Sequence, residues 1–180
     1  EIEGKEFSIT NVINYLEKEN KKISTETLYN YLEALCSTFI INRVYRYDIH
    51  GKTLLKTLNK FYVSDLGIKR IKSNEKELNY SRCLENLIYN DLIIKGYEVY
   101  IGKLKNGEID FIASKNNELN YIQVTYSLNS EETINREFSA LEEINDNYNK
   151  YVISLDEEDY SRNGIKHINA IKFLLSDELD

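Results

Sequence analysis

The residues of this chain that could carry out chemistry gather in its second half. Asp110 lies in a short apolar run typical of a strand, and Gln123 and Thr125 lie in the next such run, where strand alternation places both on one face of a sheet. A helical stretch just before them carries Glu85, an acid that can point inward. Carboxylate and carboxamide oxygens are hard ligands of the kind Mg²⁺ prefers. The set therefore predicts the skeleton of a magnesium-dependent hydrolytic site.

The elements that must position these residues can be read from periodicity and turn signals. An apolar stripe with a helical period predicts a helix over 80–95, which Gly96 stops. The rest of the second half predicts, in order, strands at 97–101, 108–113 and 120–126, a helix at 131–147, a buried strand at 150–155, a short strand at 164–168 and a helix at 170–175. The order is αβββαβ with a tail.

The first half has a different pattern. Apolar residues at helical spacing predict two short helices, the first capped by Ser8 or Thr10 and the second by Ser24. A β-branched and aromatic strand at 40–47, a turn at 48–52 and a returning strand at 54–63 follow. Helix, helix and hairpin is the order of a winged helix. We therefore expect a mixed α/β (α+β) chain with a winged-helix-like domain at 1–75 and a second domain at 76–180.

A winged helix suggests DNA as a partner, and the charge distribution limits where DNA could bind. Residues 1–80 carry a net charge of +2 and residues 81–180 a net charge of −9, so phosphate contacts should come from the first half. The candidate contacts are the basic side chains of the hairpin and polar residues of the second helix: Arg43, Arg46, Lys52, Lys56, Tyr29 and Asn30. Because the same helix carries Glu26 and Glu33, a module that contacts protein is an equally weighted alternative.

The order αβββαβ with Glu85, Asp110 and Gln123-Val124-Thr125 resembles the PD-(D/E)XK nuclease superfamily. The resemblance implies a nuclease-like core in which Asp110 and the position of Gln123 bind Mg²⁺ and Glu85 supports them. It also implies a lysine where this chain has Thr125. A neutral hydroxyl cannot replace that charge, and losing one such group costs about 3 kcal/mol of barrier. The site is therefore expected to be degenerate, unless a cation has migrated to it, for which Arg136 is the nearest candidate in sequence.

A second resemblance covers nearly the whole chain. Four segments resemble the C-terminal half of a family of bacterial and archaeal AAA-type ATPases: Leu58 to Gly67, Leu84 to Ile88, Gly107 to Phe111, and Tyr121 to Val124. This resemblance implies that a P-loop ATPase module precedes Glu1. The absence of any methionine agrees with that expectation.

Three functions follow from these observations. The first is a recognition or regulatory region of an AAA-type ATPase, with a degenerate nuclease site and DNA as a candidate partner. The alternatives are an active Mg²⁺-dependent DNA endonuclease and a module for protein interaction or oligomerisation. No apolar run approaches the ~20 residues of a membrane span, so a cytoplasmic chain without a membrane partner is expected. Cys36 and Cys83 are expected to be buried thiols, and Mg²⁺ is the one cofactor implied.

Overall fold

The computed structural model describes residues 8–68 and 79–179, without the side chains of Lys56 and Thr57. Its helices and strands, in chain order, are α1 (Ile9–Lys18), α2 (Thr25–Ser37), β1 (Ile41–Asp48), β2 (Thr53–Val63), α4 (Tyr80–Ile94), β3 (Glu98–Lys103), β4 (Glu108–Lys115), β5 (Glu118–Val124), α5 (Glu131–Glu142), β6 (Asn149–Ser154), β7 (Ile165–Asn169) and α6 (Ala170–Leu175). The chain is thus of the mixed α/β class, and the order αβββαβ of its second half agrees with the periodicity.

Polar caps fix where the helices begin. Ser8 and Ser24 accept hydrogen bonds from backbone N–H groups at the starts of α1 and α2, as the sequence predicts. Asn79, Ser130 and Asn169 do the same for α4, α5 and α6. Each cap satisfies a backbone donor that has no partner within its helix.

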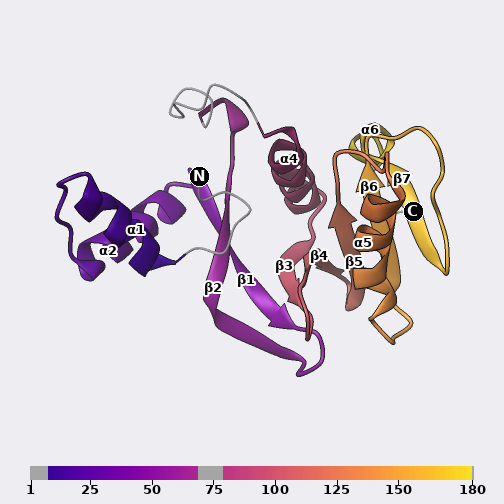
Figure 1. The fold of residues 1–180 in the computed structure, drawn as a ribbon, viewed down its shortest axis with the longest axis horizontal. Helices are drawn as coiled ribbons and strands as arrows, with labels where there is room; N and C mark the ends of the chain where they lie inside the picture. The colour runs from indigo at the N-terminus through magenta and orange to yellow at the C-terminus, as the bar shows by residue number, and fades with distance from the viewer. Residues whose placement is uncertain (1–7, 69–78, 180) are drawn as a thin grey trace.

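One sheet of seven strands runs through the molecule in the order β2-β1-β3-β4-β5-β6-β7. Neighbours from β3 to β5 are antiparallel, whereas β5-β6 and β6-β7 are parallel. The hairpin β1-β2 joins this sheet because β1 pairs in parallel with β3 over Arg46–Ile101, Tyr47–Gly102 and Asp48–Lys103. Figure 1 shows α1 and α2 beside the hairpin at one end of the molecule, and α5 and α6 at the other end.

Two apolar clusters hold the helices against the sheet. One joins Leu84, Ile88 and Leu92 of α4 and Phe173 of α6 to the sheet residues Phe111 and Ile122. The other joins Phe138 and Leu141 of α5 to Ile109, Ile112 and Val152. Since Phe111 alternates with Ile112 along β4, the two clusters lie on opposite faces of the sheet.

The hairpin also has two different faces. Phe61 of β2 packs with Leu28 and Leu32 of α2 in a third, smaller cluster. Its neighbours Lys60 and Tyr62 are buried in the opposite direction, against the main core. The hairpin therefore connects the small helical layer to the core.

Helix α5 is shorter than the sequence predicts: it ends at Glu142, whereas the apolar stripe suggested an end near Asn147. Asp146 accepts hydrogen bonds from the Tyr121 hydroxyl and the Tyr148 N–H instead of continuing the helix. Ile144, which supported the longer prediction, is buried from the loop. A short polar side chain that bonds to nearby backbone competes with helix formation, and here it ends the helix.

The division into domains at 1–75 and 76–180 stays a prediction. Strands of both parts belong to one sheet, and this pairing does not show whether either part folds by itself. Within residues 8–68 and 79–179, no helix has the length and apolar character needed to cross a membrane. Cys36 and Cys83 are both free thiols, and each is half-buried rather than fully buried.

Candidate functional site

The acids that the sequence singled out meet a buried lysine that the sequence did not assign to this site. The Lys60 ammonium lies 2.6 Å from Glu108 Oε1 and 3.7 Å from Glu85 Oε1, and only 3% of its side chain is exposed. Asp110 lies close enough to interact electrostatically with both Lys60 and Glu85. These four residues, Lys60, Glu85, Glu108 and Asp110, are called the acid–lysine cluster below.

Lys60 is positioned by β2, where alternation turns it to the same face as Tyr62. Burial alone would lower the pKa of the Lys60 ammonium, but the carboxylates of Glu85, Asp110 and Glu108 outweigh burial and raise it. The ammonium is therefore charged at neutral pH. It supplies a positive charge among the acids from a strand far from them in sequence.

Glu85 projects from α4 and is held by β2, the strand that carries Lys60. The Tyr62 hydroxyl donates a 2.6 Å hydrogen bond to Glu85 Oε1. Burial, followed by the charge of Glu85, raises the pKa of Tyr62 well above its ordinary value, so the hydroxyl keeps its proton and acts as a donor. Glu85 thus has a neutral donor and a cation as partners, which agrees with an inward-facing acid.

Asp110 lies on β4 with its carboxylate turned toward the end of β5. Asp110 Oδ2 accepts a 2.8 Å hydrogen bond from the backbone N–H of Val124. Burial, and then the nearby charge of Glu85, raise the pKa of this carboxyl well above its ordinary value, although Lys60 and the Val124 N–H act in the opposite direction. Asp110 therefore holds a proton more tightly than an exposed aspartate does.

Gln123 connects Asp110 to a second acid. Its Oε1 accepts the backbone N–H of Asp110 at 3.2 Å, and its Nε2 donates to Glu137 Oε2 at 2.8 Å. Glu137 is buried on α5 and also binds Arg136, whose guanidinium lies 2.7 Å away and is 69% exposed. Arg136, the candidate for a migrated cation, is thus paired with Glu137 at the edge of this network, whereas Lys60 and Arg46 bind the acids themselves.

Thr125 does not take the part of a lysine. It is buried, and its backbone N–H donates to the carbonyl of Ile153 at the start of the loop that follows β5. Within the described residues its hydroxyl makes no hydrogen bond to Glu85, Asp110 or Gln123.

Sequence reasoning did not assign Lys60, Tyr62, Glu108 and Glu137 to this site. One signal could have placed Lys60: in the alternating pattern of β2 it shares a face with Tyr62, an aromatic residue that can pack into a core. A lysine at an inward position requires a buried acid partner. The pattern does not say which acid that is.

The arrangement does not fit Mg²⁺. One oxygen of each expected ligand already has a protein partner, since Lys60 and Tyr62 bind Glu85 Oε1, the Val124 N–H donates to Asp110 Oδ2, and the Asp110 N–H donates to Gln123 Oε1. Across residues 8–68 and 79–179, no three His, Cys, Asp or Glu side chains are grouped so that they could hold a metal ion. A pocket of about 440 Å³ beside Gln123, Glu108 and Glu137 gives solvent access to the edge of the network.

The expected nucleic-acid contacts are not gathered on one surface. Arg43 Nη2 binds Glu33 at 2.6 Å on the outer side of the hairpin, whereas Arg46 is buried and binds Glu108 at 3.2 Å. The remaining residues whose side chains are described, Lys52, Tyr29 and Asn30, are exposed; the Lys56 side chain lies outside the described part. Binding of DNA by this set stays a prediction.

His167, Ser154 and Asp156 are linked by hydrogen bonds in a way that resembles a catalytic triad. The direction differs, because the serine hydroxyl donates to the aspartate and not to the histidine. His167 Nδ1 accepts the Tyr160 N–H, so Nε2 carries the proton toward Ser154 Oγ at 2.8 Å, and Ser154 donates to Asp156. Burial lowers the pKa of His167, which keeps the ring neutral. Because Ser154 is fully buried and its hydroxyl donates to the Asp156 carboxylate, this series of hydrogen bonds is structural.

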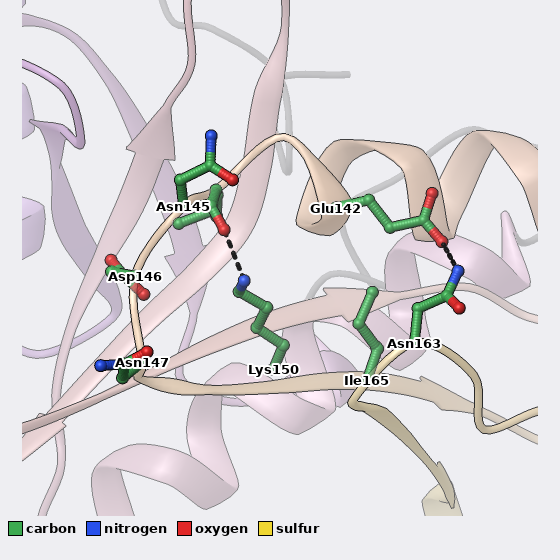
Figure 2. Close-up of a pocket in the computed structure, with 8 residues that line it drawn as sticks. Glu142, Asn145, Asp146, Asn147, Lys150, Asn163 and Ile165 are labelled. Carbon is green, nitrogen blue, oxygen red and sulfur yellow. Dashed lines mark hydrogen bonds between the residues drawn. The ribbon is translucent and has the colours of Figure 1, made fainter.

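A polar pocket of about 560 Å³ lies where α5 ends, shown in Figure 2. Lys150 points toward the loop and donates to the carbonyl of Ile144, and Asn163 donates to Glu142 Oε1 at 2.9 Å. These bonds fasten the loop that replaces the end of α5.

Replacing Asp110 by asparagine should stabilise the folded chain at neutral pH. The folded chain keeps a proton on Asp110 that the unfolded chain releases above the ordinary pKa of 3.8. The stability contributed by this group is therefore present at low pH and falls as the pH rises from 3.8 to the raised pKa. Asparagine keeps the acceptor for Val124 without the charge, so the gain should be about 1.4 kcal/mol for each unit of pKa shift.

Urea unfolding at several pH values measures this effect. The unfolding free energy of the parent should fall with rising pH more steeply than that of Asp110→Asn. A variant that is no more stable than the parent at neutral pH, and shares its pH slope, would show that Asp110 is ionised without cost.

The profile of a protein family described as Domain of unknown function (DUF4143) matches residues 80–174, from the start of α4 into α6. An uncharacterized protein of Haemophilus influenzae is 35% identical over 175 residues, which are 96% of this chain and 42% of that protein. An uncharacterized protein of Methanocaldococcus jannaschii is 34% identical over 167 residues, 87% of this chain and 36% of that protein. The chain thus spans less than half the length of either relative. No solved structure matches it.

Proposed function

The chain belongs to the family described as Domain of unknown function (DUF4143), and from this premise we propose that it is a recognition or regulatory region of a longer AAA-type ATPase. Its nuclease-like site, on this proposal, no longer cleaves. The resemblance of four segments to the C-terminal half of such ATPases supports the first part. The greater length of both relatives is compatible with a further module in the whole protein.

The nuclease-type description of the second half is supported by its topology. After α4, three antiparallel strands are followed by a helix and a strand parallel to the third, and Asp110 and Gln123 lie on neighbouring strands. The winged-helix description of the first half is supported by the order of α1, α2 and the hairpin.

The observation that carries the proposal is that the acids of the site are already neutralised by the protein itself. Lys60 binds Glu85 and Glu108 and interacts electrostatically with Asp110, where its charge opposes the binding of a divalent cation, and Arg46 adds a second charge at Glu108. A displaced Lys60 would leave its ammonium buried without a counter-ion, which is costly. The site is therefore suited to holding the hairpin on the core rather than to binding a metal.

A cleavage assay tests this absence of activity. The chain is incubated with supercoiled DNA and Mg²⁺ or Mn²⁺, beside an Asp110→Ala preparation purified in the same way. We expect the two to give equal, background cutting. Metal-dependent cutting by the parent that is lost in Asp110→Ala would contradict the proposal.

The same assay serves the second candidate, an active Mg²⁺-dependent endonuclease. One observation favours that candidate: Lys60 supplies a cation close to Asp110 in a chain that has Thr125 where a lysine is expected. If cutting is seen, Lys60→Arg, which keeps the charge in a different geometry, should reduce it.

The regulatory role is tested in the longer relative from Haemophilus influenzae. ATP hydrolysis is measured for that whole protein and for a variant with the equivalent of Lys60 and Tyr62 replaced by alanine. A change in the rate of hydrolysis in a variant that circular dichroism shows to be folded supports the proposal. A whole protein that does not hydrolyse ATP contradicts it.

A further inference from the structure

The outer side of the hairpin borders a hollow of about 770 Å³ that is separate from the acid–lysine cluster. The residues used below all line it: Tyr29 of α2, Arg43 and Tyr45 of β1, and Leu58, Asn59 and Phe61 of β2. Strand alternation separates it from the cluster, since Phe61 lies between Lys60 and Tyr62. This space is called the hairpin hollow below, and its volume is within the range of small-ligand sites.

Two buried polar atoms at the hairpin hollow have no hydrogen-bond partner within the described part of the chain. They are Arg43 Nε, a donor, and Asn59 Oδ1, an acceptor. Leaving a buried donor or acceptor unsatisfied costs about 1–3 kcal/mol each. Arg43 is also held in place, because its Nη2 binds Glu33 at 2.6 Å and its guanidinium lies 5.6 Å from the centre of the Phe61 ring. The residues that carry this donor and this acceptor therefore line one space.

The wall that carries Asn59 is an irregularity of β2. Val44 pairs with Lys60 and Arg46 pairs with Leu55, so the single residue Tyr45 lies opposite residues 56–59. Within this bulge Leu58 adopts a left-handed backbone with φ 57°, which costs a non-glycine residue about 1–2 kcal/mol. Bulges and such strain concentrate at binding sites, where they re-aim side chains.

Aromatic rings provide the remaining surface. Tyr29 and Tyr45 are 51% and 38% exposed and lie at the hollow together with Phe61. An aromatic surface favours a flat ring that can stack on it. Among the described residues that line the hollow Arg43 is the only charged one, and because Glu33 already neutralises its guanidinium, these residues offer no spare charge for a free phosphate or carboxylate.

We propose that the hairpin hollow binds a nucleobase, with Arg43 Nε donating to a ring acceptor, Asn59 Oδ1 accepting from a neighbouring N–H, and Tyr29 stacking on the ring. Every nucleobase offers an acceptor beside a donor on one edge, and stacking on aromatic side chains is how unpaired bases are held. The base can come from a free nucleotide or from a single strand. The proposal deepens the recognition role proposed above, and it does not depend on whether the acid–lysine cluster cleaves.

The experiment measures binding of a labelled single strand of about ten nucleotides, of the matching duplex, and of adenosine as a competitor. The test variants are Tyr29→Ala and Asn59→Leu. The matched control is Tyr31→Ala, since Tyr31 is 59% exposed on the same helix and does not line the hollow. Far-ultraviolet circular dichroism and the unfolding midpoint establish that each variant is folded.

We expect the chain to bind the single strand more tightly than the duplex, and each test variant to bind about tenfold more weakly while Tyr31→Ala is unchanged. If adenosine competes, the site binds free nucleosides as well as single strands. If the strand binds and adenosine does not compete, the site binds a base only within a strand. The proposal is overturned if no nucleobase probe binds, or if Tyr29→Ala, Asn59→Leu and Tyr31→Ala bind alike. Binding of an unstructured peptide, without binding of any nucleobase probe, would also overturn it. Because cleavage and ATP hydrolysis are measured separately, failure here is distinguishable from failure of the proposed ATPase role.

Discussion

Replacing Lys60 by methionine is expected to destabilise the chain by about 3–5 kcal/mol, because it removes the cation from a buried group of acids. Methionine keeps most of the length of the lysine side chain, so the loss reflects charge rather than volume. Glu85 and Glu108 lose their shared partner. Their side chains are 14% and 30% exposed, so little water can replace the ammonium. Urea unfolding followed by circular dichroism measures the change.

Two further variants show whether charge is the cause. Lys52→Met makes the same substitution at an exposed turn and should change the unfolding free energy by less than about 0.5 kcal/mol. Lys60→Met combined with Glu85→Gln removes one of the uncompensated acids and should recover part of the loss. If Lys60→Met and Lys52→Met have equal effects, Lys60 does not neutralise the acids as described.

Replacing Asn86 by alanine should cost about 1–3 kcal/mol, since the Val63 N–H loses its side-chain acceptor while the Val63 carbonyl keeps the hydrogen bond from Asn90 Nδ2 at 3.1 Å. Asn86 is fully buried on α4, where Oδ1 accepts the Val63 N–H at 2.9 Å and Nδ2 donates to the Val63 carbonyl at 2.8 Å. These bonds continue the pairing of β2 onto a helix. The same unfolding experiment measures the loss.

Asn30→Ala is the matched control, because Asn30 is an exposed residue of α2. Alanine is a better helix former than asparagine, so this variant should be as stable as the parent or slightly more so. Hydrogen exchange adds a second readout: in Asn86→Ala the amide of Val63 should lose protection. Unchanged protection together with unchanged stability would mean that α4 does not hold β2.

Both predictions concern the same feature, the attachment of the hairpin to the core. Lys60 and Tyr62 bind Glu85, and Asn86 binds Val63, so two consecutive positions of α4 hold β2. If residues 1–75 form a domain of their own, as the sequence suggests, the interface between β2 and α4 is polar and rich in hydrogen bonds.

Most helices and strands of this chain could be predicted because their signals are local. Serine and asparagine caps, a helical apolar period in α4 and the alternation of β4 and β5 each act within a few residues. The end of α5 could not be predicted in this way. Its apolar period continues to Ile144, and the hydrogen bond from Tyr121 to Asp146 that accompanies the turn comes from a strand outside the helix.

The candidate site divides in the same manner. Helical and strand periods, together with the resemblance to a nuclease superfamily, indicated that Glu85, Asp110 and Gln123 could face one another. These signals could not identify Lys60 as their partner, or show that Arg46 is buried against Glu108. Those facts depend on the parallel pairing of β1 with β3 and on the packing of β2 against α4. Periodicity specifies a face, whereas only long-range packing specifies what that face meets.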